Sequence, residues 1–127
     1  MKAKLTASAP ILLVKDVIYS ANWYRDKLGF EIAGFYGEPP GFAIIQRDHM
    51  YVMFCKCPLE KIIANWKVVD KTSNVYFWVD DVEKLYEEYK ASGATIDWDL
   101  CTQPYGVKEF GINDPEEYDI AFGQVIS

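Results

Sequence analysis

The chain has 127 residues, 50% of them hydrophobic and 25% charged, which is typical of one globular domain. The 19 acidic and 13 basic residues give a formal net charge of -6. This charge argues against binding nucleic acid, which requires a basic face, and against binding an anionic membrane surface. No apolar run approaches the ~20 residues of a membrane span. Because three cysteines cannot all be paired, we expect free thiols and a cytoplasmic location.

The two halves of the sequence share a repeated motif. Val-x-Asp-Val begins at Val14 and again at Val79, 65 residues further on, and such repeats indicate duplicated structural units. Each copy predicts a buried strand followed by a helix. The aspartate of each copy suits the helix N-cap, because its side chain can accept from free backbone N–H groups. Gly29 and Gly93 suit the left-handed position that ends a helix.

Three strand patterns follow each predicted helix. They lie at 30–35, 42–46 and 51–55 in the first half, and at 94–98, 107–112 and 118–122 in the second. Polar turns at 47–49 and 113–117 separate the last two strands of each half, which predicts hairpins.

The predicted architecture is α+β, with one domain spanning 1–127. It contains two βαβββ repeats, at about 5–57 and about 74–124. The connecting segment, about 58–73, is long for a structureless loop, and we expect a short helix over 59–66. One helix covers only one face of each sheet. The sheets are therefore expected to form a curved mixed sheet or half-open barrel, with a pocket on the concave side.

This pattern resembles the vicinal oxygen chelate superfamily, which includes glyoxalase I, extradiol dioxygenases, fosfomycin-resistance enzymes and bleomycin-resistance proteins. The segments 16–30, 77–82, 103–110 and 114–115 carry the resemblance, which extends over nearly the whole chain. Within the superfamily, the sequence is most similar to bleomycin-resistance proteins, although Tyr105 and Lys108 stand where they usually have Trp and Arg.

The same resemblance implies a homodimer with its groove between the two subunits. In that arrangement Pro10 would be the hinge for exchange of the N-terminal strand. The open edges of two four-stranded units also need protection, which pairing of two subunits would provide.

The resemblance also indicates where a metal site would be found. It puts the metal ligands of the superfamily near Ala9, at Asn74 and at Ala121. Alanine has no donor atom, and asparagine is a weak ligand for Zn, Fe or Mn. We therefore predict no metal and no cofactor.

The sequence offers no assembled set of catalytic side chains. His49, the only histidine, falls in a predicted turn, and Cys55 and Cys57 point to opposite faces of a strand. Glu109 and Asp114 are expected to serve solvation or structure. We therefore predict no catalytic residue.

A pocket without catalytic side chains can only bind its ligand. The aromatic content of 16% exceeds what the core needs, so aromatic rings are available to line the pocket. Aromatic faces stack on flat heteroaromatic rings and attract cations, while Asp97, Asp99 and Glu38 supply a negative field. We expect sequestration of a flat, cationic small molecule such as a bleomycin-class antibiotic. The predicted ligand-binding residues are Phe42, Phe54, Cys55, Trp66, Trp98, Tyr105 and Gly106.

Two alternatives stay open at this point. The first is a metal-dependent lyase or dioxygenase with atypical ligands, which metal analysis of the purified protein would reveal. The second is a structural or regulatory module without a small ligand, for which we would expect a filled groove.

Overall fold

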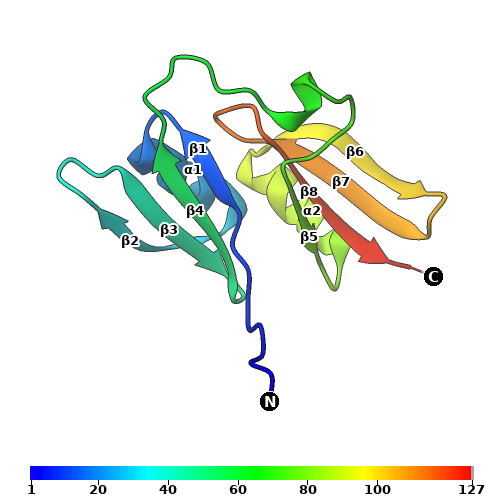
Figure 1. Cartoon of the computed structure of the whole chain (residues 1–127). Coiled ribbons are helices and arrows are strands. Elements are labelled where there is room, and N and C mark those ends of the chain that lie inside the picture. The colour runs from blue at the N-terminus through cyan, green and yellow to red at the C-terminus, as the bar shows by residue number, and fades with distance from the viewer. Residues whose placement is uncertain (127) are drawn as a thin grey trace.

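The computed structural model describes residues 1–126 and arranges them as two four-stranded sheets with two long helices (Figure 1). The order β–α–β–β–β occurs in each half, which confirms the predicted α+β duplication. The first half contains β1 (Ile11–Val14), α1 (Val17–Leu28), β2 (Glu31–Tyr36), β3 (Phe42–Arg47) and β4 (Met50–Lys56). The second half contains β5 (Val75–Trp78), α2 (Val82–Ser92), β6 (Thr95–Gln103), β7 (Val107–Asn113) and β8 (Asp119–Val125).

Both sheets have the same topology. The strand orders are β1-β4-β3-β2 and β5-β8-β7-β6. In each sheet the first strand is parallel to the last, and the other pairs are antiparallel. The two sheets stay separate and do not close into a barrel.

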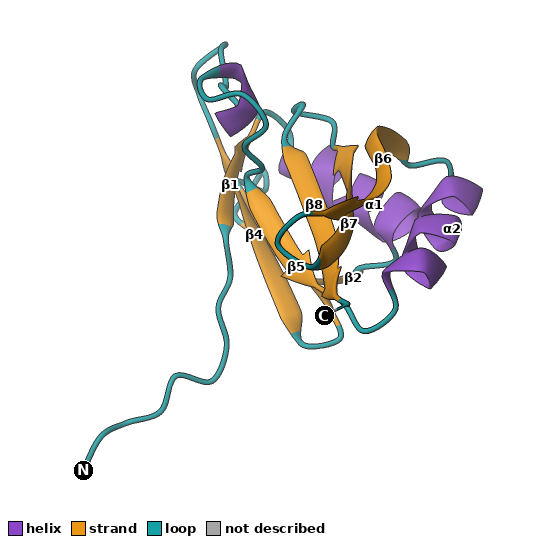
Figure 2. Cartoon of the chain, turned by 90° about the vertical axis from the view of Figure 1, so that its right-hand side faces the viewer, coloured by secondary structure: helices purple, strands orange, loops and turns teal. Residues whose placement is uncertain are grey.

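Both helices lie on the same side of the sheets, which leaves the opposite faces free of helices (Figure 2). Alternation along β1 shows the difference between the two faces. Leu12 and Val14 are buried in the core with residues of α1, whereas Ile11 and Leu13 are 60% and 48% exposed. The first sheet therefore presents apolar side chains on its helix-free face, a feature that marks interaction surfaces.

The helices begin and end where the sequence predicts. Asp16 accepts from the Tyr19 backbone N–H at 3.0 Å, and Asp81 accepts from that of Lys84 at 3.1 Å. These bonds satisfy N–H groups that have no partner within the helix. The glycines that follow, Gly29 and Gly93, have φ of 75° and 83°, in the left-handed region that glycine favours.

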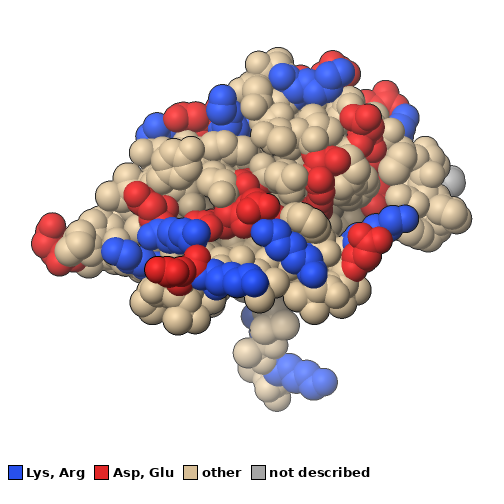
Figure 3. Space-filling view, turned by 90° about the horizontal axis from the view of Figure 1, so that it is seen from above, with Lys and Arg blue, Asp and Glu red and all other residues tan. Residues whose placement is uncertain are grey.

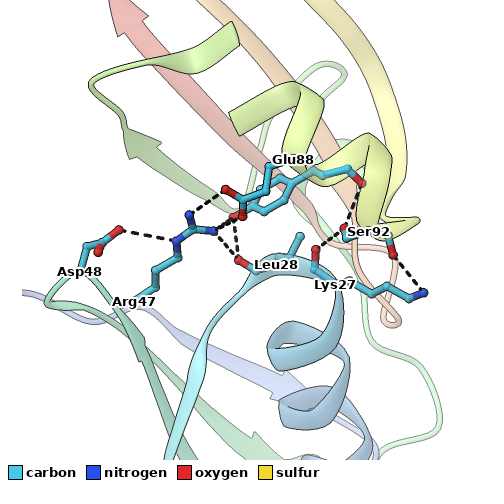
Figure 4. Close-up of polar contacts among 7 residues, drawn as sticks. Lys27, Leu28, Arg47, Asp48, Glu88 and Ser92 are labelled. Atoms are coloured by element: carbon cyan, nitrogen blue, oxygen red, sulfur yellow. Dashed lines mark hydrogen bonds and ion pairs between the residues drawn. The ribbon is translucent and has the colours of Figure 1, made fainter. Parts of the chain in front are cut away.

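A polar seam, formed by the end of α1, Arg47 and one face of α2, joins the two halves (Figure 4). Arg47 Nη1 of β3 donates to the Leu28 carbonyl and to Glu88 Oε2 of α2, both at 2.7 Å. The Tyr89 hydroxyl donates to the same Leu28 carbonyl at 2.9 Å. Ser92 and Lys27 add reciprocal side-chain bonds to each other's carbonyl oxygens, at 2.6 and 3.3 Å.

The connecting segment differs from its prediction. The short helix expected over 59–66 is wrong, because the segment forms only a single 3₁₀ turn, η1 (Asn65–Lys67). The Asn65 backbone N–H donates to Asn74 Oδ1 at 2.9 Å instead of to a carbonyl one helical turn earlier. Side-chain bonding of this kind competes with helix formation.

Strand β6 is longer than its prediction. The sequence predicts a strand over 94–98, and the structure extends it to Gln103. Its pairing with β7 shifts register on both sides of Trp98. Such bulges bend a strand and interrupt the simple alternation that the prediction depends on.

The molecular surface mixes charges of both signs. In the view from above, acidic and basic side chains lie close together over the connecting segment and the neighbouring strands (Figure 3). Among the described residues, no helix is long and apolar enough to cross a membrane.

Candidate functional site

A cavity of about 590 Å³ lies between the connecting segment and the sheet of the second half. Three of the predicted ligand-binding residues, Trp66, Trp98 and Tyr105, contribute to its walls. They come from η1, β6 and the turn after β6. The structure thus brings together aromatic rings that are up to 39 residues apart in the chain.

The connecting segment is anchored to the end of this sheet. Trp66 Nε1 donates to the Glu117 carbonyl oxygen at 2.7 Å, and Lys67 Nζ lies 3.2 Å from Glu117 Oε2. The Trp66 side chain is left 38% exposed. Because its N–H is already bonded, the indole offers its ring face and edge to the cavity.

Two glycines let aromatic rings lie flat on the helix-free face of the sheet. A Cβ at Gly111 of β7 would overlap the Trp98 indole, and one at Gly123 of β8 would overlap the Tyr76 ring. Glycine therefore permits a close approach that any other residue would prevent. Trp98 forms part of the floor of the cavity, and Tyr76 lies beside it on the same sheet.

A buried carboxylate, Glu109 of β7, is held by two phenols. Its Oε1 accepts from the hydroxyls of Tyr105 at 2.7 Å and Tyr76 at 2.8 Å. The bond to Glu109 is the main cause that raises the pKa of Tyr105 to about 12. Burial, followed by the same carboxylate, raises the pKa of Tyr76. Both phenols thus remain neutral donors, and Tyr105 keeps 66% of its surface exposed beside the cavity.

A second carboxyl, Asp119 of β8, is also buried in the cavity wall. Its Oδ1 accepts from Ser73 Oγ at 2.6 Å, and its Oδ2 accepts from Trp98 Nε1 at 2.9 Å. Burial, followed by hydrogen bonding to the carboxyl of Asp97, raises the pKa of Asp119 to about 7. The carboxyl thus fixes the indole of Trp98 in its flat orientation.

The cavity has an acidic lining. Four carboxyl groups contribute to it, together with the single ammonium group of Lys71. Carboxylates beside aromatic faces form a site that attracts positive charge. The four acidic residues are Asp70, Asp97, Glu109 and Asp119.

The remaining predicted residues lie elsewhere. Gly106 adopts φ of 80° in the turn after Tyr105, at the edge of the site. Phe42 and Cys55 are cross-strand partners on the sheet of the first half, where both are partly exposed. Phe54 has no exposed surface, and its ring centroid lies 5.1 Å from that of Tyr24 in the core. Phe54 therefore lies in the core and lines neither of the two cavities of this section.

Sequence reasoning missed Tyr76, Ser73 and Asp119 as parts of this site, and it assigned Glu109 to solvation or structure. Glu109 is 5% exposed and Asp119 is 4% exposed, so a solvated role for Glu109 is wrong. One signal was available in the sequence. Two carboxyls lie in the last strands among small residues, Gly111, Ala121 and Gly123, that leave space above the sheet.

The positions of the superfamily metal ligands do not fit a metal. Ala121 has no donor atom, and Asn74 Oδ1 accepts from the Asn65 N–H. Within residues 1–126, no group of three or more His, Cys, Asp or Glu side chains is placed to hold an ion.

A second cavity, of about 540 Å³, opens where the two halves meet. Phe30, Phe77 and Phe122 line it, and the Arg47–Glu88 pair of the polar seam lies along its wall. None of the predicted ligand-binding residues lines it. We therefore assign the candidate site to the first cavity.

Comparisons with known proteins agree with this architecture. The family model of the Glyoxalase/Bleomycin resistance protein/Dioxygenase superfamily matches residues 6–122. No curated protein sequence matches the chain.

Several solved structures share the fold at low sequence identity. The bleomycin-binding protein of bleomycin-producing Streptomyces verticillus, complexed with copper(II)-bleomycin, has a TM-score of 0.71 and 22% identity, covering 99% of each chain. The bleomycin resistance determinant encoded on transposon Tn5 has a TM-score of 0.75 and 21% identity, covering 94% of this chain and 98% of its own. A glyoxalase/bleomycin resistance protein/dioxygenase from Alicyclobacillus acidocaldarius has a TM-score of 0.78 and 16% identity, covering 100% and 96%.

Proposed function

Because the chain belongs to the glyoxalase/bleomycin resistance protein/dioxygenase superfamily, we propose that it is a ligand-binding protein of the bleomycin-resistance type. In this proposal it sequesters a flat, cationic small molecule such as a bleomycin-class antibiotic, and it needs no metal to do so. The observation that carries the proposal is the cavity in which Trp66, Trp98 and Tyr105 stand beside buried carboxyls.

The aromatic walls supply affinity for a flat ligand. Trp98 is fixed by its bond to Asp119, and Trp66 is fixed by its bond to the Glu117 carbonyl. Rings held in place lose little conformational freedom when a ligand stacks on them. Each stacking or cation–π contact contributes about 0.5–2 kcal/mol.

The carboxyls supply selectivity for positive charge. Glu109 and Asp119 are almost fully buried, and a charge removed from water needs a compensating partner. Tyrosine, serine and tryptophan donors supply part of that compensation. A cationic group of the ligand would supply the rest, whereas an anionic ligand would be repelled.

We further propose a homodimer. Within one chain, the first sheet leaves Ile11 and Leu13 exposed on its helix-free face, with Phe42 and Cys55 partly exposed nearby. A second copy covering this face would bury apolar surface and bring Phe42 and Cys55 close to a ligand groove. Light scattering coupled to size-exclusion chromatography would give twice the mass of the chain.

We also propose a cytoplasmic location. The three cysteines, Cys55, Cys57 and Cys101, are all free thiols. Free thiols persist in a reducing compartment.

Titration with bleomycin, followed by tryptophan fluorescence, tests the proposal. We expect quenching that saturates, a weaker affinity in W66A, and a matched control in W23F, whose ring packs against Tyr24 instead of lining the cavity. An absence of quenching at high micromolar bleomycin would contradict the antibiotic assignment. Metal analysis of the purified protein, before any bleomycin is added, separates this proposal from a metal-dependent lyase or dioxygenase, for which a stoichiometric ion is expected.

A further inference from the structure

We propose that Glu109 selects the ligand of the cavity by accepting a hydrogen bond from a protonated amine through its Oε2 atom. This inference rests on the proposed function and deepens it, because it names the chemical group that the cavity recognises and the atom that recognises it. A quaternary ammonium group has the same charge and no N–H donor, so it binds less tightly at this atom.

Glu109 is a buried carboxylate without a counter-ion. It is 5% exposed, and within residues 1–126 it forms no ion pair with a lysine or an arginine. Glutamate is almost never so buried unless it is paired, because a charge removed from water needs compensation. Two phenol hydroxyls supply part of that compensation, and neither carries a positive charge. The carboxylate is therefore left with a charge that a bound cation would balance.

The two oxygens of Glu109 have different surroundings. Oε1 accepts from the hydroxyls of Tyr105 at 2.7 Å and Tyr76 at 2.8 Å, whereas no donor within residues 1–126 bonds to Oε2. Among the side chains that the structure describes, only Asn113 Oδ1 is both unbonded and sealed from solvent. Oε2 therefore stays accessible from the cavity that Glu109 lines, and it is free to accept one more bond.

The lysines nearest to Glu109 in the sequence and in the cavity do not supply the missing charge. Lys108 precedes Glu109 in β7, and neighbouring residues of a strand point to opposite faces of the sheet. Its ammonium group binds Glu83 of α2 instead. Lys71 lines the same cavity, yet it forms no ion pair with Glu109 within the described part of the chain. A protonated amine on the ligand would take the vacant role.

Asp119, the other buried carboxyl of the cavity, has both oxygens in use. Its Oδ1 accepts from Ser73 Oγ at 2.6 Å, and its Oδ2 accepts from Trp98 Nε1 at 2.9 Å. Asp119 thus holds the cavity wall, whereas Glu109 has an acceptor to spare. Trp98 and Tyr105 line the cavity together with Glu109, so a flat ring that carries the amine can stack on one of these rings.

The first test compares three ligands of similar shape on the wild-type chain. The probes are 2-naphthylmethylamine, its N-trimethylated form and 2-naphthylmethanol, at pH 7 and constant ionic strength. The NMR shifts of the Trp66 and Trp98 indole N–H groups, assigned with W66F and W98F, give the dissociation constants. We expect the protonated amine to bind about tenfold more tightly than the alcohol, with the trimethylated form in between, because a hydrogen bond to a charged group is stronger than a neutral one.

Three results of this comparison would overturn the inference. The first is equal affinity for the amine and the alcohol, and the second is a trimethylated form that binds as tightly as the amine. The third is the absence of binding by all three probes.

The second test changes Glu109 itself. E109Q keeps an oxygen for the two phenols and replaces the charged acceptor by an amide N–H donor. We expect the preference for the amine over the alcohol to fall from about tenfold to about threefold or less. E60Q makes the same change of charge at an exposed position that does not line the cavity, and we expect it to keep the wild-type preference.

Circular dichroism establishes whether E109Q is folded. A folded E109Q that prefers the amine as strongly as the wild type overturns the inference. If E109Q does not fold, the wild-type ranking of the three probes decides.

Titration with bleomycin separates this inference from the proposed function. Bleomycin that binds wild type and E109Q with equal affinity contradicts the role of Glu109 and leaves the proposed function intact. Probe binding that depends on Glu109, without any binding of bleomycin, supports the inference for another amine and contradicts the antibiotic assignment.

Discussion

The Tyr24 hydroxyl donates to Asp114 Oδ2 at 2.6 Å, and this buried bond links α1 of the first half to the β7–β8 turn of the second. The other oxygen of Asp114 accepts from the backbone N–H groups of Glu116 and Tyr118, at 3.0 and 2.9 Å. One carboxyl thus orders the turn and connects it to the neighbouring helix. Since Trp66 is bonded to Glu117 in the same turn, this linkage also supports the wall of the candidate site.

Replacing Tyr24 by phenylalanine removes the hydroxyl and keeps the ring. We expect Y24F to lower the free energy of unfolding by about 1–3 kcal/mol, because Asp114 is left buried with one oxygen unpaired. Urea denaturation measures the change. Y86F is the matched control, since the Tyr86 hydroxyl bonds to the exposed Asp99 at 2.9 Å and we expect a smaller loss there. Equal losses in the two variants would contradict a special role for the buried bond.

Two buried carboxyls make stability depend on pH. Burial is the largest cause that raises the pKa of Asp114 to about 6 and that of Asp119 to about 7. In the unfolded chain, both pKa values return to about 3.9. Between about pH 4 and pH 7 the folded chain therefore holds protons that the unfolded chain has released. Their contribution to stability is complete below pH 4 and is lost as the pH rises to 7.

We therefore expect the free energy of unfolding to be higher at pH 5 than at pH 8, at constant ionic strength. The contribution of Asp114 is on the order of 2 kcal/mol. D119N removes the second titrating group and flattens the dependence, while D80N, at an exposed position, retains the wild-type slope. Urea denaturation across this range checks the prediction, and a D119N slope equal to that of the wild type would refute it.

The fold could be predicted because its signals are local and duplicated. The aspartates Asp16 and Asp81 and the glycines Gly29 and Gly93 mark the helix ends, and capping depends on neighbouring residues alone. The connecting segment could not be predicted in the same way. Its course depends on the Asn65–Asn74 and Trp66–Glu117 bonds, which join positions that only the folded chain brings together.

The candidate site was predictable in its aromatic part and not in its acidic part. Trp66 and Tyr105 are large rings in loop-like segments, and they line one cavity together with Trp98 of β6, whereas the predicted Phe42 and Phe54 do not line it. Glu109 and Asp119 look like ordinary polar residues of a half-exposed strand in the sequence. They are buried because Tyr76 and Trp98 lie across the glycines of the neighbouring strands, a relationship that no local spacing reveals.

Glycine at position 111 is required for the flat position of Trp98. We expect G111A to lift the indole, to break its bond to Asp119, and to lower the free energy of unfolding by about 1–3 kcal/mol. We also expect the near-ultraviolet circular dichroism of the tryptophans to change and the affinity for bleomycin to fall. G41A is the control, because a Cβ at Gly41 meets no atom within 4 Å. We expect its stability, its spectrum and its affinity to stay at wild-type values. A G111A spectrum identical to that of the wild type would show that the indole has another resting place.

Arg47 stabilises the contact between the two halves through its forked guanidinium group. Both terminal nitrogens bind Glu88, at 2.7 and 3.0 Å, and Nη1 also reaches the Leu28 carbonyl and the Tyr89 hydroxyl. We expect R47M to lower the free energy of unfolding by about 2 kcal/mol, because a charged hydrogen bond contributes about 1.5–3 kcal/mol and Tyr89 still donates to Leu28. We expect R47K to lose less free energy of unfolding than R47M but to remain below the wild type, since lysine cannot form both bonds of the fork.

R25M is the matched control, because Arg25 pairs at the surface with its neighbour Asp26. Urea denaturation of the three variants ranks them, and an R47M loss no greater than that of R25M would mean that apolar packing alone joins the halves.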